Sequence, residues 1–231
     1  SNVLNNVPLK KQTEQSILLN DFTGKKFSRE ILFKNNVRTL RHELLKSPNQ
    51  VFLITSTQQS AGKTTVIESL AASLVLSKKK VLLIDLNFGN NSITQKHNAE
   101  VLIQDLAGVV KYNSPAASQK LWSKTALEGL YVIGCKEGNF TPSEALYNID
   151  MKAFMDLLKT EFDYILLEGA ALNDFADSRE LVSFADEVFT VFSAASTVSH
   201  ADDKSIKFIT SLSEKNKGTI LNNVLKENMN F

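Results

Sequence analysis

Cysteine, proline and tryptophan are scarce in this chain of 231 residues, which contains one Cys, four Pro and one Trp. The single cysteine, Cys135, excludes an internal disulfide framework and any multi-cysteine metal or iron–sulfur site. We interpret it as a small apolar residue at the end of a strand. The three histidines lie in dissimilar sequence contexts, which argues against a zinc site. They are His42, His97 and His200.

A strong net charge and long apolar runs are also missing. The formal net charge is +1, which argues against a strongly electrostatic partner, so we expect no nucleic-acid binding. No apolar run has the length that spans a bilayer, and no signal peptide is present, so we expect a cytoplasmic chain. A hydrophobic content of 43% is sufficient for the core of one large α/β domain.

Residues 51–66, VFLITSTQQSAGKTTV, have the organisation of a phosphate-binding loop. The apolar run Val51–Ile54 predicts a strand, and the apolar spacing from Val66 onward predicts a helix. Small and polar residues lie between them and end in Gly-Lys-Thr, as the motif requires. In such a loop, backbone N–H groups and the helix dipole create one concavity of positive potential.

The residue types in this loop predict ATP or ADP with Mg²⁺ as the cofactor. Gly62 lets the main chain approach the phosphates, Lys63 supplies a cation for them, and the Thr64 hydroxyl can bind Mg²⁺. The motif's first glycine is replaced by Thr57, so a strand-to-helix turn with a chance Gly-Lys-Thr stays open, as does a distorted loop without nucleotide. The candidate binding residues are Thr57, Gln58, Gln59, Ser60, Ala61, Gly62, Lys63, Thr64 and Thr65.

Two further apolar runs end in an acidic residue. Val81–Ile84 precedes Asp85, and the run that begins at Phe162 ends at Glu168. Continuous apolar runs are typical of strands buried on both faces of a parallel sheet. Ligands bind at the carboxyl ends of such strands, so both acids are candidates for the same site.

Strands alternate with helices along the rest of the chain. This alternation predicts an α/β fold with three layers, in which helices cover both faces of a doubly wound, mostly parallel sheet of about six to eight strands. The other expected strands are 130–134, 187–192 and 218–221. The expected helices are 28–45, 100–110, 115–121, 151–160, 175–186 and 198–213. One more helix is expected to begin near Pro142, with Ser143 as its N-cap. Residues 1–27, which lack a clear period, are interpreted as an N-terminal arm or linker, and 28–231 as one P-loop domain.

These motifs, taken in order, resemble those of the bacterial protein-tyrosine kinases, whose P-loop fold is shared with the cell-division-site and partitioning ATPases. The resemblance covers the chain from about residue 26. Thr55-Ser56 and Gly62-Lys63-Thr64 resemble the family's Walker A motif, 81–87 resembles its apolar triplet followed by D-x-D, and 162–168 resembles its Walker B strand.

The resemblance also implies roles for three residues outside these motifs. Residues 33–41 resemble the family's first helix, whose E-x-x-R-x-x-R motif is used in subunit packing. Arg38 and Arg41 are therefore candidate oligomer contacts, although Asn35 replaces the glutamate. An asparagine at the end of the last strand contacts adenine in related ATPases, which makes Asn222 the candidate here.

As a function, the resemblance implies the tyrosine-kinase-like cytoplasmic domain of a membrane polysaccharide co-polymerase. Such domains control the biosynthesis and export of exopolysaccharide, lipopolysaccharide or capsule. A homo-oligomer is implied, with the co-polymerase segment in the same or a partner chain. Attachment to the inner membrane would then occur through a segment absent from this chain.

The sequence departs from the family at its catalytic positions. Asn87 replaces the second acid of D-x-D, and Glu168 replaces the Walker B aspartate; a carboxylate displaced by about an ångström can lower the rate about 100-fold. The chain ends without a tyrosine cluster. The candidate catalytic residues are Lys63, Asp85 and Glu168, and the candidate metal ligands are Thr64, Asp85 and Glu168.

Three functions stay open on these grounds. The first is a nucleotide-binding regulatory module with impaired kinase activity, and the second is an active autophosphorylating tyrosine kinase or slow ATPase. The third is a partitioning-type ATPase, against which Gln58 counts because that class has a signature lysine at this position.

Overall fold

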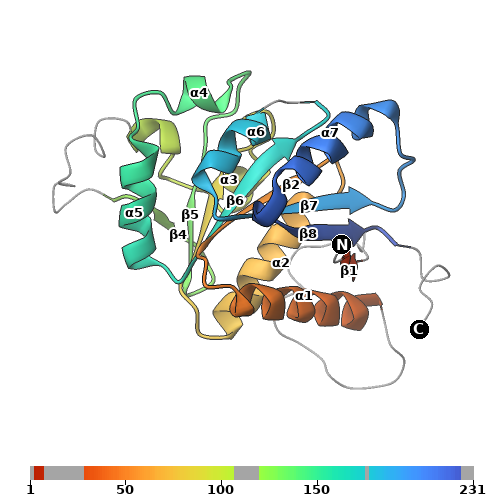
Figure 1. Cartoon of the computed structure of the whole chain (residues 1–231). Helices are drawn as coiled ribbons and strands as arrows, with labels where there is room; N and C mark the ends of the chain where they lie inside the picture. Colours follow the sequence, from red (N-terminus) through yellow and green to blue (C-terminus); the bar gives the residue numbers. More distant parts are fainter. Residues whose placement is uncertain (1–2, 8–28, 107–119, 175–176, 225–231) are drawn as a thin grey trace.

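The computed structural model describes residues 3–7, 29–106, 120–174 and 177–224, which form an α/β fold (Figure 1). Eight strands make one sheet in the order β1-β8-β7-β2-β6-β3-β5-β4. The strands are β1 (Val3–Val7), β2 (Val51–Ser56), β3 (Val81–Asp85), β4 (Ser123–Lys124), β5 (Leu130–Ile133), β6 (Tyr164–Ala171), β7 (Glu187–Ser193) and β8 (Asn216–Asn222). The helices are α1 (Arg29–Lys46), α2 (Lys63–Leu76), α3 (Ser92–Lys96), α4 (Pro142–Ala145), α5 (Met151–Glu161), α6 (Asp177–Leu181) and α7 (His200–Ser211), with 3₁₀ turns η1 (Ile103–Leu106), η3 (Val182–Phe184) and η4 (Ser213–Lys215).

The sheet is parallel except at its β4 edge, where β4 pairs antiparallel with β5. Alternate residues of a strand point to opposite faces, and both faces of the central strands are buried. In β2, Val51 and Leu53 pack into the cluster on one face, whereas Phe52 and Ile54 pack into the cluster on the other. The continuous apolar runs are therefore central strands, and the predicted three-layer, mostly parallel fold is confirmed.

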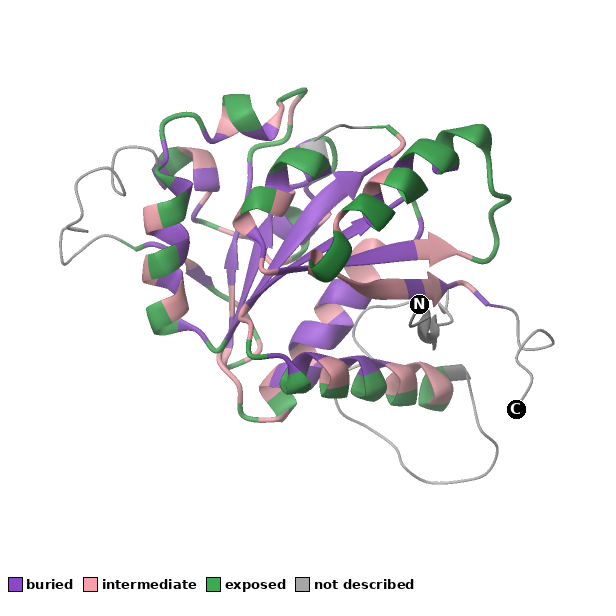
Figure 2. Ribbon diagram, viewed as in Figure 1, coloured by how far each residue is buried: buried purple, intermediate pink, exposed green. Residues whose placement is uncertain are grey.

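Helices cover both faces of the sheet. Residues of α1 and α2 contribute to one apolar cluster, and residues of α5 and α6 contribute to the other. Figure 2 shows buried strands between helices whose outer faces are exposed. Among the described helices, none has both the length and the apolar character needed to cross a bilayer.

Some local predictions were wrong. Ser143 does not cap α4: Thr141 is the N-cap, and it forms a capping box with Glu144, with a proline in the first turn. The helix expected over 175–186 is divided into α6 and the 3₁₀ turn η3.

Other expectations fall partly outside the described residues. The turn η1 lies within the helix expected over 100–110, and most of the helix expected over 115–121 is not described. The unpredicted strand β1 lies inside the segment interpreted as an arm and pairs with β8 at the sheet edge. Because 8–28 is not described, the division into an arm and a domain stays a prediction.

Candidate functional site

The predicted strand, loop and helix are present over residues 51–66. β2 ends at Ser56, and α2 begins at Lys63. Gly62 adopts the left-handed conformation with φ 87°, and no described side chain caps the first turn of α2. The first N–H groups of a helix have no partner within it, so those of α2 are available beside the positive end of the helix dipole. This local geometry can bind a phosphate.

Thr57 replaces the motif's first glycine without backbone strain. Positive φ angles occur within the loop at Ser60 and Gly62, so position 57 does not require the freedom of a glycine. The Thr57 amide donates to the carbonyl of Val191 at 3.4 Å, and the Thr57 carbonyl accepts from the amide of Asn173 at 3.0 Å. The loop is thus anchored to the strands on both sides of β2.

Lys63 and Thr64 both contact the carboxylate of Glu168. Lys63 Nζ lies 3.1 Å from Glu168 Oε1, and Thr64 Oγ1 donates to the same oxygen at 2.6 Å. Glu168 is fully buried in β6, directly opposite Asp85 of β3. The predicted cation, hydroxyl and acid therefore meet at the carboxyl edge of the sheet.

The second carboxylate oxygen of Glu168, Oε2, is a candidate ligand for the predicted Mg²⁺. Oε2 is buried and has no hydrogen-bond partner among the described residues. Mg²⁺ prefers oxygen ligands and usually takes only one or two carboxylates from the protein, with phosphates and waters completing its shell. Glu168 and the Thr64 hydroxyl fit that donor set. No cluster of three or more acidic, His or Cys side chains suited to a metal occurs in the described ranges, so a cation here would depend on phosphate oxygens and water.

Asp85 is buried among hydrogen-bond donors of its own chain. Its Oδ2 accepts from the Thr94 amide at 3.0 Å and from Thr94 Oγ1 at 2.7 Å, and its Oδ1 accepts from the Asn87 amide at 3.2 Å. Burial, together with the charge of Glu168, raises the pKa of Asp85 to about 6, although the bonds from Thr94 and Asn87 oppose this shift. Asp85 can therefore exchange a proton near neutral pH, as a general base must. Its role as a metal ligand stays a prediction.

Small residues after Glu168 allow α6 to pack closely on β6. A Cβ on Gly169 would lie 2.5 Å from Ser178 Oγ and 3.1 Å from Leu53 Cδ1. The Ser178 hydroxyl donates to the Ala170 carbonyl at 2.6 Å. The sequence Glu-Gly-Ala-Ala departs from the family's D-[ST]-P-P, and its small side chains permit this close contact between β6 and α6.

Asn222 lies against the loop from beneath. It is fully buried, and its Nδ2 donates to the carbonyl of Ala61 at 2.7 Å. Its Oδ1 is buried and has no hydrogen-bond partner within the described part of the chain. Asn222 therefore positions the loop, while its predicted contact with adenine stays a prediction.

The two candidate oligomer contacts lie on α1 in different surroundings. Arg38 is exposed and donates to Asn35 Oδ1 at 3.0 Å within the same helix. Arg41 Nη1 donates to the carbonyl of Ser73 at 3.1 Å, so this guanidinium attaches α1 to α2 inside the chain. Their contact with a second subunit stays a prediction.

Asp202, which was not predicted from the sequence, connects the loop to α7. Its Oδ2 accepts from the Ser199 amide at 2.6 Å and from Gln58 Nε2 at 3.0 Å, and its Oδ1 accepts from Asn173 Nδ2 at 2.8 Å. Burial opposes ionisation, but the hydrogen bonds from Ser199, Asn173 and Gln58 lower the pKa of Asp202 to about 2. The pattern Ser199-x-x-Asp202 before an apolar helical period was a signal that could have identified it as a capping residue.

The amino-acid sequence is similar to one protein family and to several known proteins. The profile of the CobQ/CobB/MinD/ParA nucleotide binding domain matches residues 52–230. The tyrosine-protein kinase CpsD of Streptococcus agalactiae is 26% identical over 176 residues, which cover 76% of this chain and 76% of CpsD. The succinoglycan biosynthesis transport protein ExoP of Rhizobium meliloti is 26% identical over 162 residues, or 69% of this chain and 20% of ExoP, so the chain spans about a fifth of that protein.

Solved structures with the same fold include a kinase and a nucleotide complex. The kinase domain of the Escherichia coli tyrosine kinase ETK has a TM-score of 0.75 at 20% identity and covers 100% of this chain and 93% of its own. Cobyrinic acid a,c-diamide synthase from Mycobacterium smegmatis, with a bound ATP analogue and magnesium, has a TM-score of 0.54 at 16% identity and covers 75% of this chain and 70% of its own.

Proposed function

The chain belongs to the CobQ/CobB/MinD/ParA nucleotide binding domain family, and from this premise we propose that it binds ATP or ADP with Mg²⁺ at residues 57–65. We further propose that it is a tyrosine-kinase-like domain that regulates exopolysaccharide, lipopolysaccharide or capsule biosynthesis and export, with impaired phosphoryl transfer. The observation that carries the proposal is the meeting of Lys63, Thr64 and Glu168 beside the uncapped start of α2.

Each residue at this point has a role in binding the nucleotide. The loop amides would bind phosphate oxygens, and Lys63 would leave the Glu168 carboxylate to contact the phosphates. Thr64 and Glu168 would hold Mg²⁺, which neutralises charge on the transferred phosphoryl group. Asp85, whose pKa lies near neutrality, would orient or deprotonate the attacking hydroxyl.

Impaired transfer is proposed because the acids are altered while the phosphate-binding groups are retained. Asn87 has no negative charge to offer a metal, and the longer side chain of Glu168 places its carboxylate close to Lys63 and Thr64. Phosphoryl transfer depends on accurate positioning, so these changes affect the rate more than they affect nucleotide binding.

An active autophosphorylating kinase or slow ATPase is the second candidate, which the likeness to CpsD and ETK favours. A partitioning-type ATPase is less well supported. Gln58 stands where that class has a lysine, and its side chain donates to the carbonyl of Thr197 and to Asp202.

The context of the domain is part of the same proposal. ExoP carries its matching region in a protein about five times longer, and its name describes a transport protein of polysaccharide biosynthesis. We propose that this domain likewise acts in the cytoplasm on a membrane co-polymerase segment in the same or a partner chain, as a homo-oligomer.

Titration with a fluorescent ATP analogue, with and without Mg²⁺, tests the proposal. The wild type should bind, and Lys63→Ala should lose at least about tenfold in affinity because a charge-assisted contact to phosphate is removed. Lys152→Ala removes an exposed lysine of α5 and should bind like the wild type. Binding that is equal in all three proteins, or absent from the wild type, would contradict the proposal. Incubation with γ-labelled ATP then separates a kinase, a hydrolase and an inactive binder.

A further inference from the structure

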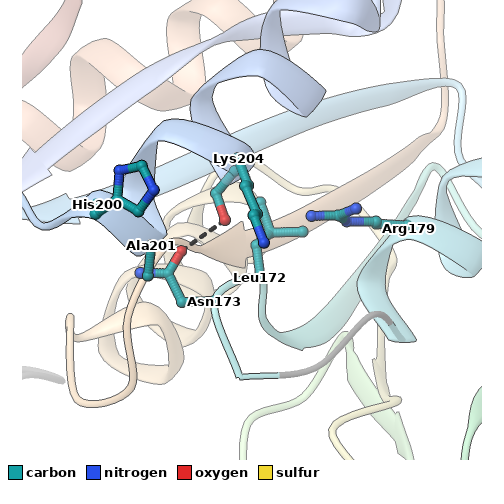
Figure 3. A pocket seen from close by; sticks show the side chains of 7 residues that line it. Leu172, Asn173, Arg179, His200, Ala201 and Lys204 are labelled. Carbon is teal, nitrogen blue, oxygen red and sulfur yellow. Dashed lines mark hydrogen bonds between the residues drawn. The ribbon is translucent and has the colours of Figure 1, made fainter.

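A cavity of about 290 Å³ lies between α6 and α7, beyond the end of β6 (Figure 3). Its lining includes Leu172 and Asn173 after β6, Arg179 on α6, and His200, Lys204 and Ser205 on α7. Two lining residues connect the cavity to the start of the phosphate-binding loop: the Leu172 amide donates to the Ser56 carbonyl at 2.8 Å, and the Asn173 amide donates to the Thr57 carbonyl at 3.0 Å. It therefore lies beside the proposed nucleotide site and outside it.

Two cationic side chains, Arg179 and Lys204, line this cavity from different helices. In Figure 3 the side chain of Arg179 extends from α6 toward α7, whereas that of Lys204 extends from α7 toward the segment after β6. Both residues are exposed. Within the described ranges, no salt bridge is formed by either side chain; Arg179 lies over the ring of Phe208, 5.1 Å from its centroid. Because both side chains are exposed, water and salt screen their charges, but an anion between them would contact two cationic donors at once. Asp202, an acid that contacts the lining, is occupied by hydrogen bonds from three other residues.

The other polar groups of the lining are already engaged. Asn173 donates through Nδ2 to Asp202 at 2.8 Å and accepts through Oδ1 from the Ser205 hydroxyl at 2.6 Å. His200 has a side chain that is 93% exposed and lies 3.2 Å from Asp203, so it belongs to the rim. Arg179 and Lys204, which are also exposed, are therefore the charged donors of the lining that a ligand can reach.

We propose that the cavity binds a phosphate monoester, with its phosphoryl group between Arg179 and Lys204 and its organic part in the remaining space of the cavity. A phosphoryl group of this kind carries about −1.5 to −2 charges at pH 7, which two cations match, and guanidinium can bind it through two parallel hydrogen bonds. The cavity is also much larger than the ~30 Å³ that one water occupies, so it has room for more than the phosphoryl group. The ester can come from a phosphorylated protein side chain or from a free metabolite.

Titration of the whole chain with phenyl phosphate tests this site by isothermal calorimetry. Arg179→Gln and Lys204→Gln should each weaken binding by about tenfold or more, since each loses one charge-assisted contact. Lys207→Gln removes the same charge from an exposed position of α7 outside the lining and should change affinity less than about twofold. If Lys207→Gln lost as much affinity for phenyl phosphate as Arg179→Gln and Lys204→Gln, the loss would be a general effect of charge, and the proposal would be overturned.

Lys63→Ala separates this site from the phosphate-binding loop. Phenyl phosphate should bind Lys63→Ala as it binds the wild type, even if nucleotide binding is lost. Loss of phenyl phosphate binding in Lys63→Ala, with retention in Arg179→Gln and Lys204→Gln, would place the anion at the loop and reject the cavity.

Two further ligand series define the ligand class. A phosphotyrosine peptide represents a phosphorylated protein side chain, and glucose 1-phosphate represents a free metabolite. The ligand that binds more tightly, and whose affinity decreases in Lys204→Gln, identifies the source. The unphosphorylated peptide should not bind, and inorganic phosphate should bind more weakly than phenyl phosphate. Equal affinity for inorganic phosphate and phenyl phosphate, or for the two forms of the peptide, would overturn the assignment to a monoester.

Discussion

At the scale of single residues, Glu168 has the greatest effect on the phosphate-binding loop. Its carboxylate contacts the cation and the hydroxyl that would otherwise face a nucleotide, through one oxygen at 3.1 Å and 2.6 Å. A ligand must therefore displace Glu168 from Lys63 before the lysine can reach a phosphate.

Restoring the family's acids should raise phosphoryl transfer. Glu168→Asp combined with Asn87→Asp shortens one carboxylate and returns a second negative charge to the metal site. We expect turnover to increase on the order of tenfold or more if misplaced metal ligands limit the rate. The measurement is product formation from γ-labelled ATP, and Asp156→Asn, an exposed change on α5, is the control. Unchanged turnover in a double variant that still binds nucleotide would show that metal ligation is not limiting.

Asp85 should give the chain a characteristic dependence of stability on pH. Burial and the charge of Glu168 raise its pKa from 3.8 to about 6, so folding favours its protonated form. The stabilisation is complete below pH 3.8 and is lost as the pH rises through about 6, a decrease of roughly 3 kcal/mol in the free energy of unfolding.

Urea unfolding at a series of pH values measures this effect, with the fluorescence of Trp122 as the probe, since its ring packs edge-on against Phe162. The difference in the free energy of unfolding between the wild type and Asp85→Asn should change between pH 4 and 6. The contributions of the other acids cancel in this difference because both proteins contain them. Asp202 does not enter this window, since its pKa is lowered to about 2. A difference that is constant across this range would contradict the raised pKa of Asp85.

At the scale of elements, a buried acid, Asp202, connects the loop to α7. Asp202 is 2% exposed and accepts hydrogen bonds from the N-cap of α7, from Gln58 in the loop and from Asn173 after β6. The three segments are far apart in the sequence. The position of the loop is thus coupled to the start of this helix.

Asp202→Ala should destabilise the chain by about 2–4 kcal/mol, since it removes a cap and leaves buried donors without an acceptor. It should also weaken nucleotide binding, because Gln58 loses its anchor. Asp203→Ala is a matched control: its carboxylate pairs with the exposed His200 and should contribute less than about 1 kcal/mol. Urea unfolding and nucleotide titration give the two results, and equal effects of the two substitutions would contradict the coupling.

Elements with a strong local signal were predictable from sequence. The central strands were identified because both of their faces are buried, which produces continuous apolar runs such as Val81–Ile84. The edge strands β1 and β4 were not identified: β4 has two residues, and β1 lies in a segment without a clear period. The N-cap of α4 was misplaced by two residues because Thr141 and Ser143 have equivalent side-chain chemistry, and only the pairing with Glu144 distinguishes them.

At the scale of the whole molecule, the sequence predicts which residues lie together at one edge of the sheet better than it predicts their contacts. The parallel direction of β2, β3 and β6 was predicted from the alternation of strands and helices, and it brings Asp85, Glu168 and the loop to the same edge of the sheet. The order in which these strands lie was not predicted. The contact between Lys63 and Glu168 and the position of Asp202 depend on long-range packing, for which a single sequence has no local signal. The cavity between α6 and α7 was missed for the same reason.

The most direct measurement of the central claim is a crystal structure of the chain with Mg²⁺ and a non-hydrolysable ATP analogue. We expect the polyphosphate to lie against the amides of residues 57–65, with Lys63 Nζ moved from Glu168 to a phosphate oxygen and Mg²⁺ bound by Thr64. A loop without density for nucleotide, in which Lys63 still contacts Glu168 at saturating analogue, would contradict the claim.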